Sequence, residues 1–231
     1  MRRRWIKNLW RLLVIATMVG CVLTAPGCIF FGWAGHVVAG GETVTAQYKP
    51  QDRLTLVLVD DPSRQLEDPT MAGRIASSIG RELKKNKIIT EFVSDVEVAR
   101  VATLQGEKFA AMPLDQLGRA VGAAQVLHVH VTQYHHRPVG GLWEGSAWLR
   151  VKIFDVENRH RLFPMPPATG ASDGDRDMPV NAFRRYSYRS DHARAIRQTL
   201  SNKFADHISL TVAQVFFTHQ PPRDLEVEQI N

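Results

Sequence analysis

Two neighbouring stretches of the chain alternate between apolar and polar residues, a pattern of period two that predicts paired β-strands. In residues 125–134 the apolar side chains point one way, while His128, His130 and Thr132 point the other. The two faces of residues 143–156 are Ala147, Leu149, Val151 and Ile153 on one side and Ser146, Trp148, Arg150 and Lys152 on the other. A turn at 138–141 joins the strands. The pattern therefore predicts a hairpin with one apolar and one polar face.

The segment before this hairpin predicts strands and helices in alternation. Residues 54–59 are apolar on both faces, which is typical of a central strand covered on both sides. Asp68 and Pro69 predict the capped start of a helix whose apolar residues recur at helical spacing. A second strand is expected at 88–93, and residues 94–97 match a capping box that opens a short helix.

The segment after the hairpin predicts a short strand at 160–163, an irregular loop over 164–184 and a long closing helix over 190–219. Residues 220–231 are expected to form a flexible tail. The sequence thus predicts one α/β domain of the α+β variant over 49–219. Its single mixed sheet of about four to five strands would be flanked by helices and closed by a long C-terminal helix.

The amino terminus has the layout of a secretory signal peptide: a cationic start, a short apolar run and then small residues. The apolar run over 12–24 is shorter than the ~20 residues that a membrane-spanning helix needs. Ala25-Pro26-Gly27-Cys28 resembles a bacterial lipobox, which is cut immediately before a cysteine that becomes acylated. We therefore expect a lipoprotein signal peptide at 1–27 and lipidation at Cys28, with Cys21 as the alternative.

Residues 28–48 would then form a membrane-proximal tether, with an uncleaved amino-terminal anchor as the alternative. Ile29, rather than an acidic residue, follows Cys28, which favours the outer membrane by analogy with enterobacterial sorting. No cysteine lies beyond residue 28, so packing alone must hold the domain together. The expected location is the cell envelope, on the periplasmic face of a membrane.

The net charge of the chain does not indicate a nucleic-acid-binding surface. The whole chain has 29 Lys and Arg against 23 Asp and Glu, a net charge of +6. The cationic residues that belong to the leader are Arg2, Arg3, Arg4, Lys7 and Arg11. Without them, the two signs nearly balance, so the basic character comes mainly from the leader.

The polar face of the predicted hairpin is the best candidate for contact with a protein partner. Its members are His128, His130, Trp148, Arg150 and Lys152. Tryptophan and arginine are favoured as anchors in protein interfaces. The alternative is that the long closing helix simply covers this face.

Metal binding and catalysis are weaker interpretations of the polar residues. His128 and His130 would chelate a divalent metal only with a third ligand, and none is evident on the neighbouring strand. Asp173, Asp175 and Asp177 are spaced as in calcium loops but lack the glycine and the bidentate glutamate. Asp60 and Asp61 follow a strand as catalytic acids do, yet turn or capping roles are commoner there.

No catalytic fingerprint is present in the sequence. The chain contains no nucleophile elbow, no zinc-protease motif, no phosphate-binding loop and no dinucleotide fingerprint. We therefore expect a protein that is not an enzyme and that carries no cofactor.

The order of predicted elements resembles a superfamily of bacterial envelope lipoproteins that includes the amino-terminal domain of TolB, CsgG and LpoB. Residues 54–60 match its opening apolar strand followed by an acid. Residues 117–127 are similar to its helix-Gly-Ala-strand passage, and 149–158 to its hairpin. Gly122 would let the chain leave the helix in a left-handed conformation. The resemblance implies a non-enzymatic adaptor or assembly factor that binds other envelope proteins.

Overall fold

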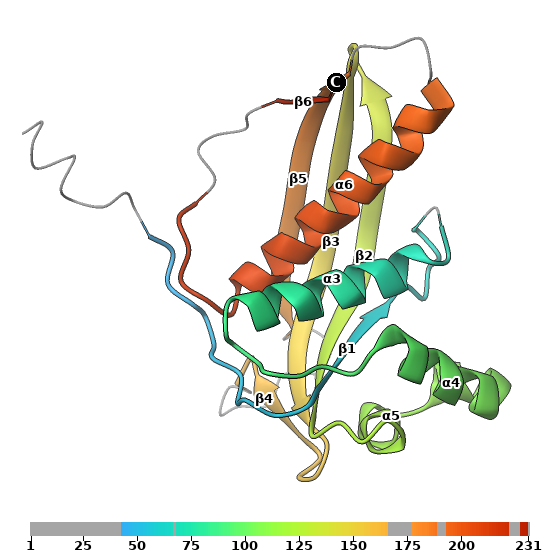
Figure 1. Cartoon of the computed structure of the whole chain (residues 1–231), viewed down its shortest axis with the longest axis vertical. Helices are drawn as coiled ribbons and strands as arrows, with labels where there is room; N and C mark the ends of the chain where they lie inside the picture. The colour runs from blue at the N-terminus through green and yellow to red at the C-terminus, as the bar shows by residue number, and fades with distance from the viewer. Residues whose placement is uncertain (1–42, 67, 166–176, 189–192, 222–226, 231) are drawn as a thin grey trace, which may run out of the picture. The chain divides into compact units, whose positions relative to one another are not determined.

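A mixed β-sheet forms the centre of the structure, a computed structural model that describes residues 43–66, 68–165, 177–188, 193–221 and 227–230 (Figure 1). Its six strands are β1 (Thr55–Asp60), β2 (Gln125–Val139), β3 (Leu142–Asp155), β4 (His160–Phe163), β5 (Met178–Tyr188) and β6 (Glu228–Ile230). The order across the sheet is β1-β2-β3-β5-β6, with β4 paired to β3. The β1–β2 and β5–β6 pairs are parallel and the others antiparallel.

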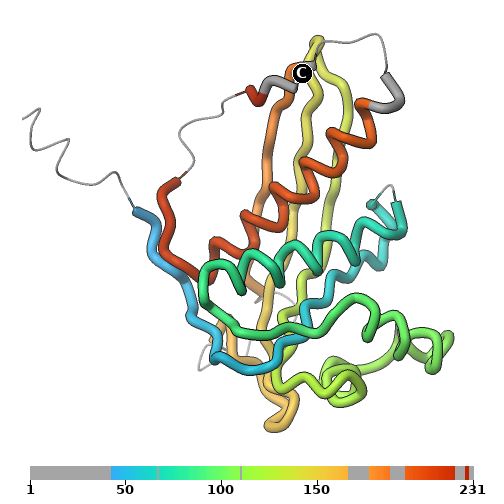
Figure 2. The backbone as a smooth tube through the Cα atoms, in the orientation of Figure 1, coloured from blue at the N-terminus to red at the C-terminus, as the bar shows by residue number. Residues whose placement is uncertain are grey.

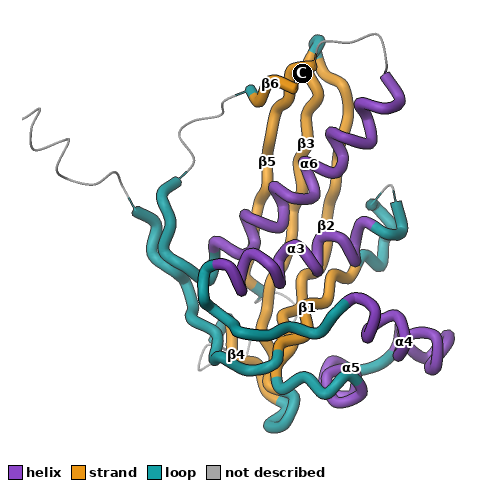
Figure 3. Tube along the Cα trace, viewed as in Figure 1, coloured by secondary structure: helices purple, strands orange, loops and turns teal. Residues whose placement is uncertain are grey.

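Helices flank this sheet (Figures 1 and 3), and the two core clusters show that they cover both of its faces. They are α3 (Met71–Lys85), α4 (Asp95–Gln105), α5 (Leu114–Ala120) and α6 (Ala193–Gln214), with a 3₁₀ turn, η1 (Gly106–Ala111), after α4. Helices α3 and α6 cross one face, as the tube in Figure 2 also shows, and enclose the larger core. Helices α4 and α5 cover part of the opposite face around Leu56, Val126 and Val156.

The predicted fold class is confirmed: one mixed sheet is flanked by helices and closed by a long C-terminal helix. The alternation of the hairpin is also confirmed, since Val129 lies opposite Val151 and both are fully buried. The pairing shifts at an irregularity between Val131 and Gln133. Because such a bulge resets the alternation, Tyr134 and His136 then point into the larger core.

Several predicted boundaries are wrong. Part of the expected loop 164–184 is strand β5, because Val180, Ala182 and Tyr186 alternate and bury their side chains in the larger core. Part of the expected tail, 228–230, pairs with β5 as β6. The expected strand over 88–93 makes only one bridge to β1, because α4 begins directly after it.

Strand β1 lies at the edge of the sheet rather than at its centre. Its two faces are nevertheless covered as expected, by α3 on one side and by α4 and α5 on the other. Helix α3 begins at Met71, not at Pro69, because the Asp68 carboxylate accepts hydrogen bonds from the backbone and hydroxyl of Thr70. The Ser94 cap of α4 is confirmed, since its hydroxyl accepts from the Glu97 amide.

Two glycines fix close approaches or tight turns in this fold. Gly122 has φ +71°, as expected for a left-handed exit from α5. Gly145 lies on β3 directly under α6, where an added Cβ atom would stand 2.6 Å from the Phe204 ring. The α6–β3 contact therefore requires glycine at this position.

Replacing Gly145 by alanine should destabilise the protein by about 1–3 kcal/mol, because the new methyl group overpacks the contact with Phe204. The matched control is Gly73→Ala on α3, where a Cβ atom meets nothing within 4 Å. That change should stabilise the helix by up to about 1 kcal/mol. Urea unfolding measures both; equal effects of the two changes would contradict the packing described here.

Candidate functional site

The five residues predicted to contact a partner lie together on one face of the β2–β3 hairpin. His128 is paired with Lys152 and His130 with Arg150, while Trp148 lies further along β3. Helix α6 packs on the opposite face, where Phe204 lies in the larger core. The alternative that the closing helix covers the polar face is therefore wrong. We call the face formed by His128, His130, Trp148, Arg150 and Lys152 the open face.

A hollow of about 310 Å³ lies on the open face. It is lined by His128, His130, Thr132, Arg150, Lys152 and Asp177. Sequence reasoning grouped Asp177 with Asp173 and Asp175, which lie outside the described residues, and so missed its place here. The chain brings Asp177 to the hollow because it immediately precedes β5, which pairs with β3.

A buried ion pair supports this hollow. Asp177 lies 3.0 Å from the guanidinium of Arg161 and 3.6 Å from the ammonium of Lys152. The side chains of Asp177 and Arg161 are each only 7% exposed. The Arg161 contribution was not predicted, because the residue pattern of the short strand β4 does not reveal which of its side chains will be charged and buried.

Asp60 at the end of β1 connects to the two histidines. Its carboxylate lies 3.6 Å from His128 Nε2 and 3.5 Å from His130 Nδ1. The neighbouring Asp61 accepts backbone hydrogen bonds from Gln65 and Leu66, which is the turn role expected for it. The two acids of the Asp60-Asp61 pair therefore act separately.

His128 is neutral at pH 7. Burial, and to a smaller extent the nearby Lys152 cation, lower the pKa of His128 to about 4 against the opposing effect of Asp60. Its Nδ1 atom has no hydrogen-bond partner among the described residues. The hollow thus combines a neutral imidazole with cationic and anionic groups, which suits polar recognition of another molecule.

Trp148 gives the open face an apolar anchor. Its side chain is 40% exposed, and the His135 ring meets it edge-on with centroids 6.3 Å apart. The Thr132 hydroxyl donates to the Trp148 carbonyl at 2.8 Å, which fixes the strand pairing beside it. An exposed tryptophan held between polar neighbours is an arrangement typical of interface anchors.

The four histidines of β2 do not act together. His135 lies beside Trp148, whereas His136 is buried and stacks on Phe204 with an interplanar angle of 2°. In the described part of the chain, no three His, Cys, Asp or Glu side chains are placed to hold a metal ion.

His136 makes the core sensitive to acid. Neither ring nitrogen has a hydrogen-bond partner among the described residues, and burial lowers the pKa of His136 to about 4, with a smaller effect from Arg197. The unfolded chain therefore takes up a proton between about pH 6.5 and pH 4 that the folded state resists. Stability due to this residue is present above pH 6.5 and is lost as the pH falls.

Replacing His136 by phenylalanine should remove about 2 kcal/mol of the stability loss between pH 7 and pH 4.5, because phenylalanine keeps the ring stack and cannot be protonated. Urea unfolding of both proteins at the two pH values measures it. His130→Phe on the open face is the control, and it should leave most of the decrease in unfolding free energy between pH 7 and pH 4.5 unchanged. An unchanged acid loss in His136→Phe would contradict this origin.

A scan against protein-family models finds no match, and no curated protein matches the chain. Solved structures are similar to it at low identity. A PelC dodecamer from Paraburkholderia phytofirmans is 13% identical over 77% of this chain and 98% of its own, with a TM-score of 0.40. Lipoprotein GNA1162 from Neisseria meningitidis is 12% identical over 66% of this chain and 99% of its own, with a TM-score of 0.41. Protein XCC0632 from Xanthomonas campestris is 10% identical over 76% of this chain and 91% of its own, also with a TM-score of 0.41. These values define no family for the chain.

The predicted lipidation sites, Cys28 and Cys21, lie outside the described residues, as do the leader and most of the tether. None of the helices in the described ranges is both long and apolar enough to cross a membrane.

Proposed function

We propose that this chain is a lipid-anchored protein of the bacterial cell envelope that works by binding other envelope proteins through the open face. It catalyses no reaction and needs no cofactor. The observation that carries the proposal is that α6 and α3 pack on one side of the hairpin, which leaves the tryptophan- and arginine-bearing side uncovered by these helices. The sequence resemblance to the TolB, CsgG and LpoB superfamily supports the same role.

The chemistry of the open face suits a protein partner. Trp148 supplies apolar area, and Arg150 and Lys152 supply charge on the same face of the hairpin. Aromatic and arginine side chains carry much of the binding energy in interfaces, while the surrounding charges set orientation and specificity. A partner surface with an apolar pocket and a carboxylate next to it would complement this face.

The lipid has a physical role in this proposal. Acyl chains at Cys28 would hold the domain at a membrane surface, where restricted volume raises its effective concentration toward membrane-bound partners. Even a weak open-face contact would then be occupied. The outer membrane is the proposed site, with Ile29 following the lipidated cysteine.

Replacing Cys28 by serine should release the protein from membranes, because the acyl chains are lost. Membrane fractionation and intact-mass measurement of the mature protein test this. Cys21→Ser is the matched control and should keep the mass increase of the acyl groups. An unmodified, uncleaved amino terminus in the unaltered protein would contradict lipid anchoring and favour the signal-anchored alternative.

A photo-crosslinking amino acid at position 146, next to Trp148 on the same face of β3, should capture envelope proteins in intact cells and leaves the tryptophan in place. The matched control is the same group at Leu104 on α4, which is 72% exposed and lies away from the hairpin. Trp148→Ala should weaken capture from a neighbouring position by at least tenfold. Equal capture at positions 146 and 104 would argue against a dedicated binding face.

A further inference from the structure

The free edge of β1 presents backbone groups that the described chain leaves unpaired. Thr55 uses this edge to contact residues 91–93: its amide donates to the Glu91 carbonyl and its carbonyl accepts from the Val93 amide at 2.9 Å. Because successive residues of a strand alternate between its two edges, Val57 and Val59 face the same way as Thr55. Among the described residues, no backbone hydrogen bond reaches either of them on this edge, although both residues are buried.

A slot of about 250 Å³ runs beside these backbone groups. Its walls are α3 on one side and α4 on the other, which cover opposite faces of β1. Its lining is mainly apolar and many of the side chains are small: Val57, Leu58, Val59, Ala72, Gly73, Ala76, Ser77, Val93, Asp95, Val98, Ala99 and Phe109. The slot thus occupies the place where a further strand of the sheet would lie.

The chain itself shows how an extended segment fits there. Residues 91–93 run parallel to β1 and bridge it at Phe92, whose ring packs on Gly80 of α3. Ser94 then caps α4 and turns the chain away, so the position beside Val57 and Val59 stays open. Gly73 borders this open part, since a Cβ atom there would meet nothing within 4 Å.

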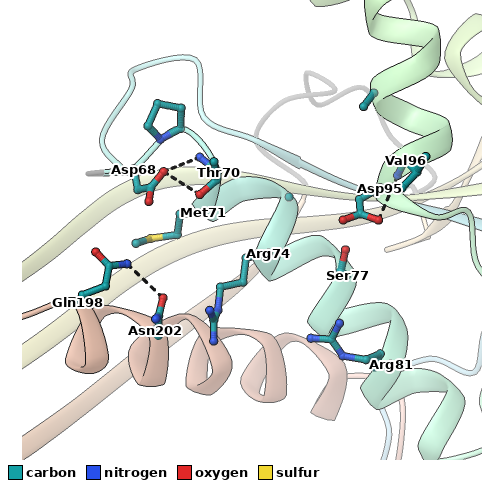
Figure 4. Close-up of a pocket in the computed structure, with 13 residues that line it drawn as sticks. Asp68, Thr70, Met71, Arg74, Ser77, Arg81, Asp95, Val96, Gln198 and Asn202 are labelled. Carbon is teal, nitrogen blue, oxygen red and sulfur yellow. Dashed lines mark hydrogen bonds between the residues drawn. The ribbon is translucent and has the colours of Figure 1, made fainter. Parts of the chain in front are cut away.

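A larger polar hollow of about 840 Å³ adjoins the slot and shares Gly73, Ser77, Asp95 and Ala99 with it. Figure 4 shows Arg74 of α3 between the start of α4 and the α6 residues Gln198 and Asn202, with Arg81 further along α3. Arg74 is paired with Asp206 at 3.4 Å. Arg81 donates to the Ser78 hydroxyl at 2.6 Å and has no ion pair with a carboxylate in the described ranges.

We propose that the β1 edge binds an extended peptide segment of a partner protein, which adds a strand to the sheet between α3 and α4. Unpaired amides and carbonyls on a strand edge are complementary to an extended backbone and to little else. The narrow lining selects small or apolar side chains at alternate positions, and Arg81 selects an acidic side chain beside them. This surface is separate from the open face.

The test uses the full chain as bait for a phage-displayed library of random dodecapeptides. Selected peptides should alternate small or apolar residues and carry an acidic residue. Gly73→Leu places a large side chain at the border of the slot and should weaken their binding at least tenfold, whereas Gly73→Ala, whose Cβ atom meets nothing within 4 Å, should change it less than twofold. Methylation of alternate peptide amides should abolish binding, and bound peptide should protect the Val57 and Val59 amides from hydrogen exchange.

Three outcomes would overturn the proposal. The first is that no selected peptide distinguishes Gly73→Leu from the unaltered protein. The second is that selected peptides lose binding in Trp148→Ala instead, which would support the open face alone. The third is that the Val57 and Val59 amides are already protected from hydrogen exchange in the free protein, and more so at higher protein concentration. That result would mean that a second copy of the chain occupies the β1 edge. Arg81→Gln tests the acidic preference and should weaken acidic peptides more than neutral ones.

Discussion

The packing of α6 against one side of the β2–β3 hairpin is the interaction on which the rest of the structure depends. Phe204 reaches the sheet at Gly145 and stacks on His136, which lies opposite Gly145 in the strand pairing. Because a strand alternates its side chains, this contact decides the exposure of both faces. Covering the side of Leu149 and Val151 leaves the side of His130 and Arg150 for other contacts.

Sequence periodicity predicted the hairpin well because its alternation is long, and the same pattern correctly placed Trp148, His128 and His130 on one face. Sequence periodicity did not predict elements whose alternating pattern is short or interrupted. Strand β5 was missed because its first residues continue a loop-like composition, and with it the place of Asp177. The burial of His136 was not predicted, because the irregularity between Val131 and Gln133 reverses the alternation of β2 and the local sequence does not indicate it.

The edge position of β1 was equally hidden from the sequence. A strand that is apolar on both faces suggests a central place, because both faces must be covered. Here α3 and α4 provide that cover while the hydrogen-bonding edge between them stays open. Burial of side chains and pairing of the backbone are therefore separate properties of a strand. The pattern of apolar residues predicts the burial of side chains but not the pairing of the backbone.

The polar character of the open face depends on charged side chains that are themselves partly buried and paired. Elsewhere on the same side of the sheet, α4 and α5 cover apolar residues such as Leu56 and Val126. Around the hollow, by contrast, Asp177 and Arg161 are buried as ions, and removing such charges from water is unfavourable unless they are paired. Apolar residues of similar size would often stabilise a fold at least as well. The ion pair instead holds Lys152 beside His128 in a fixed polar arrangement, which is useful to a surface that must recognise another molecule.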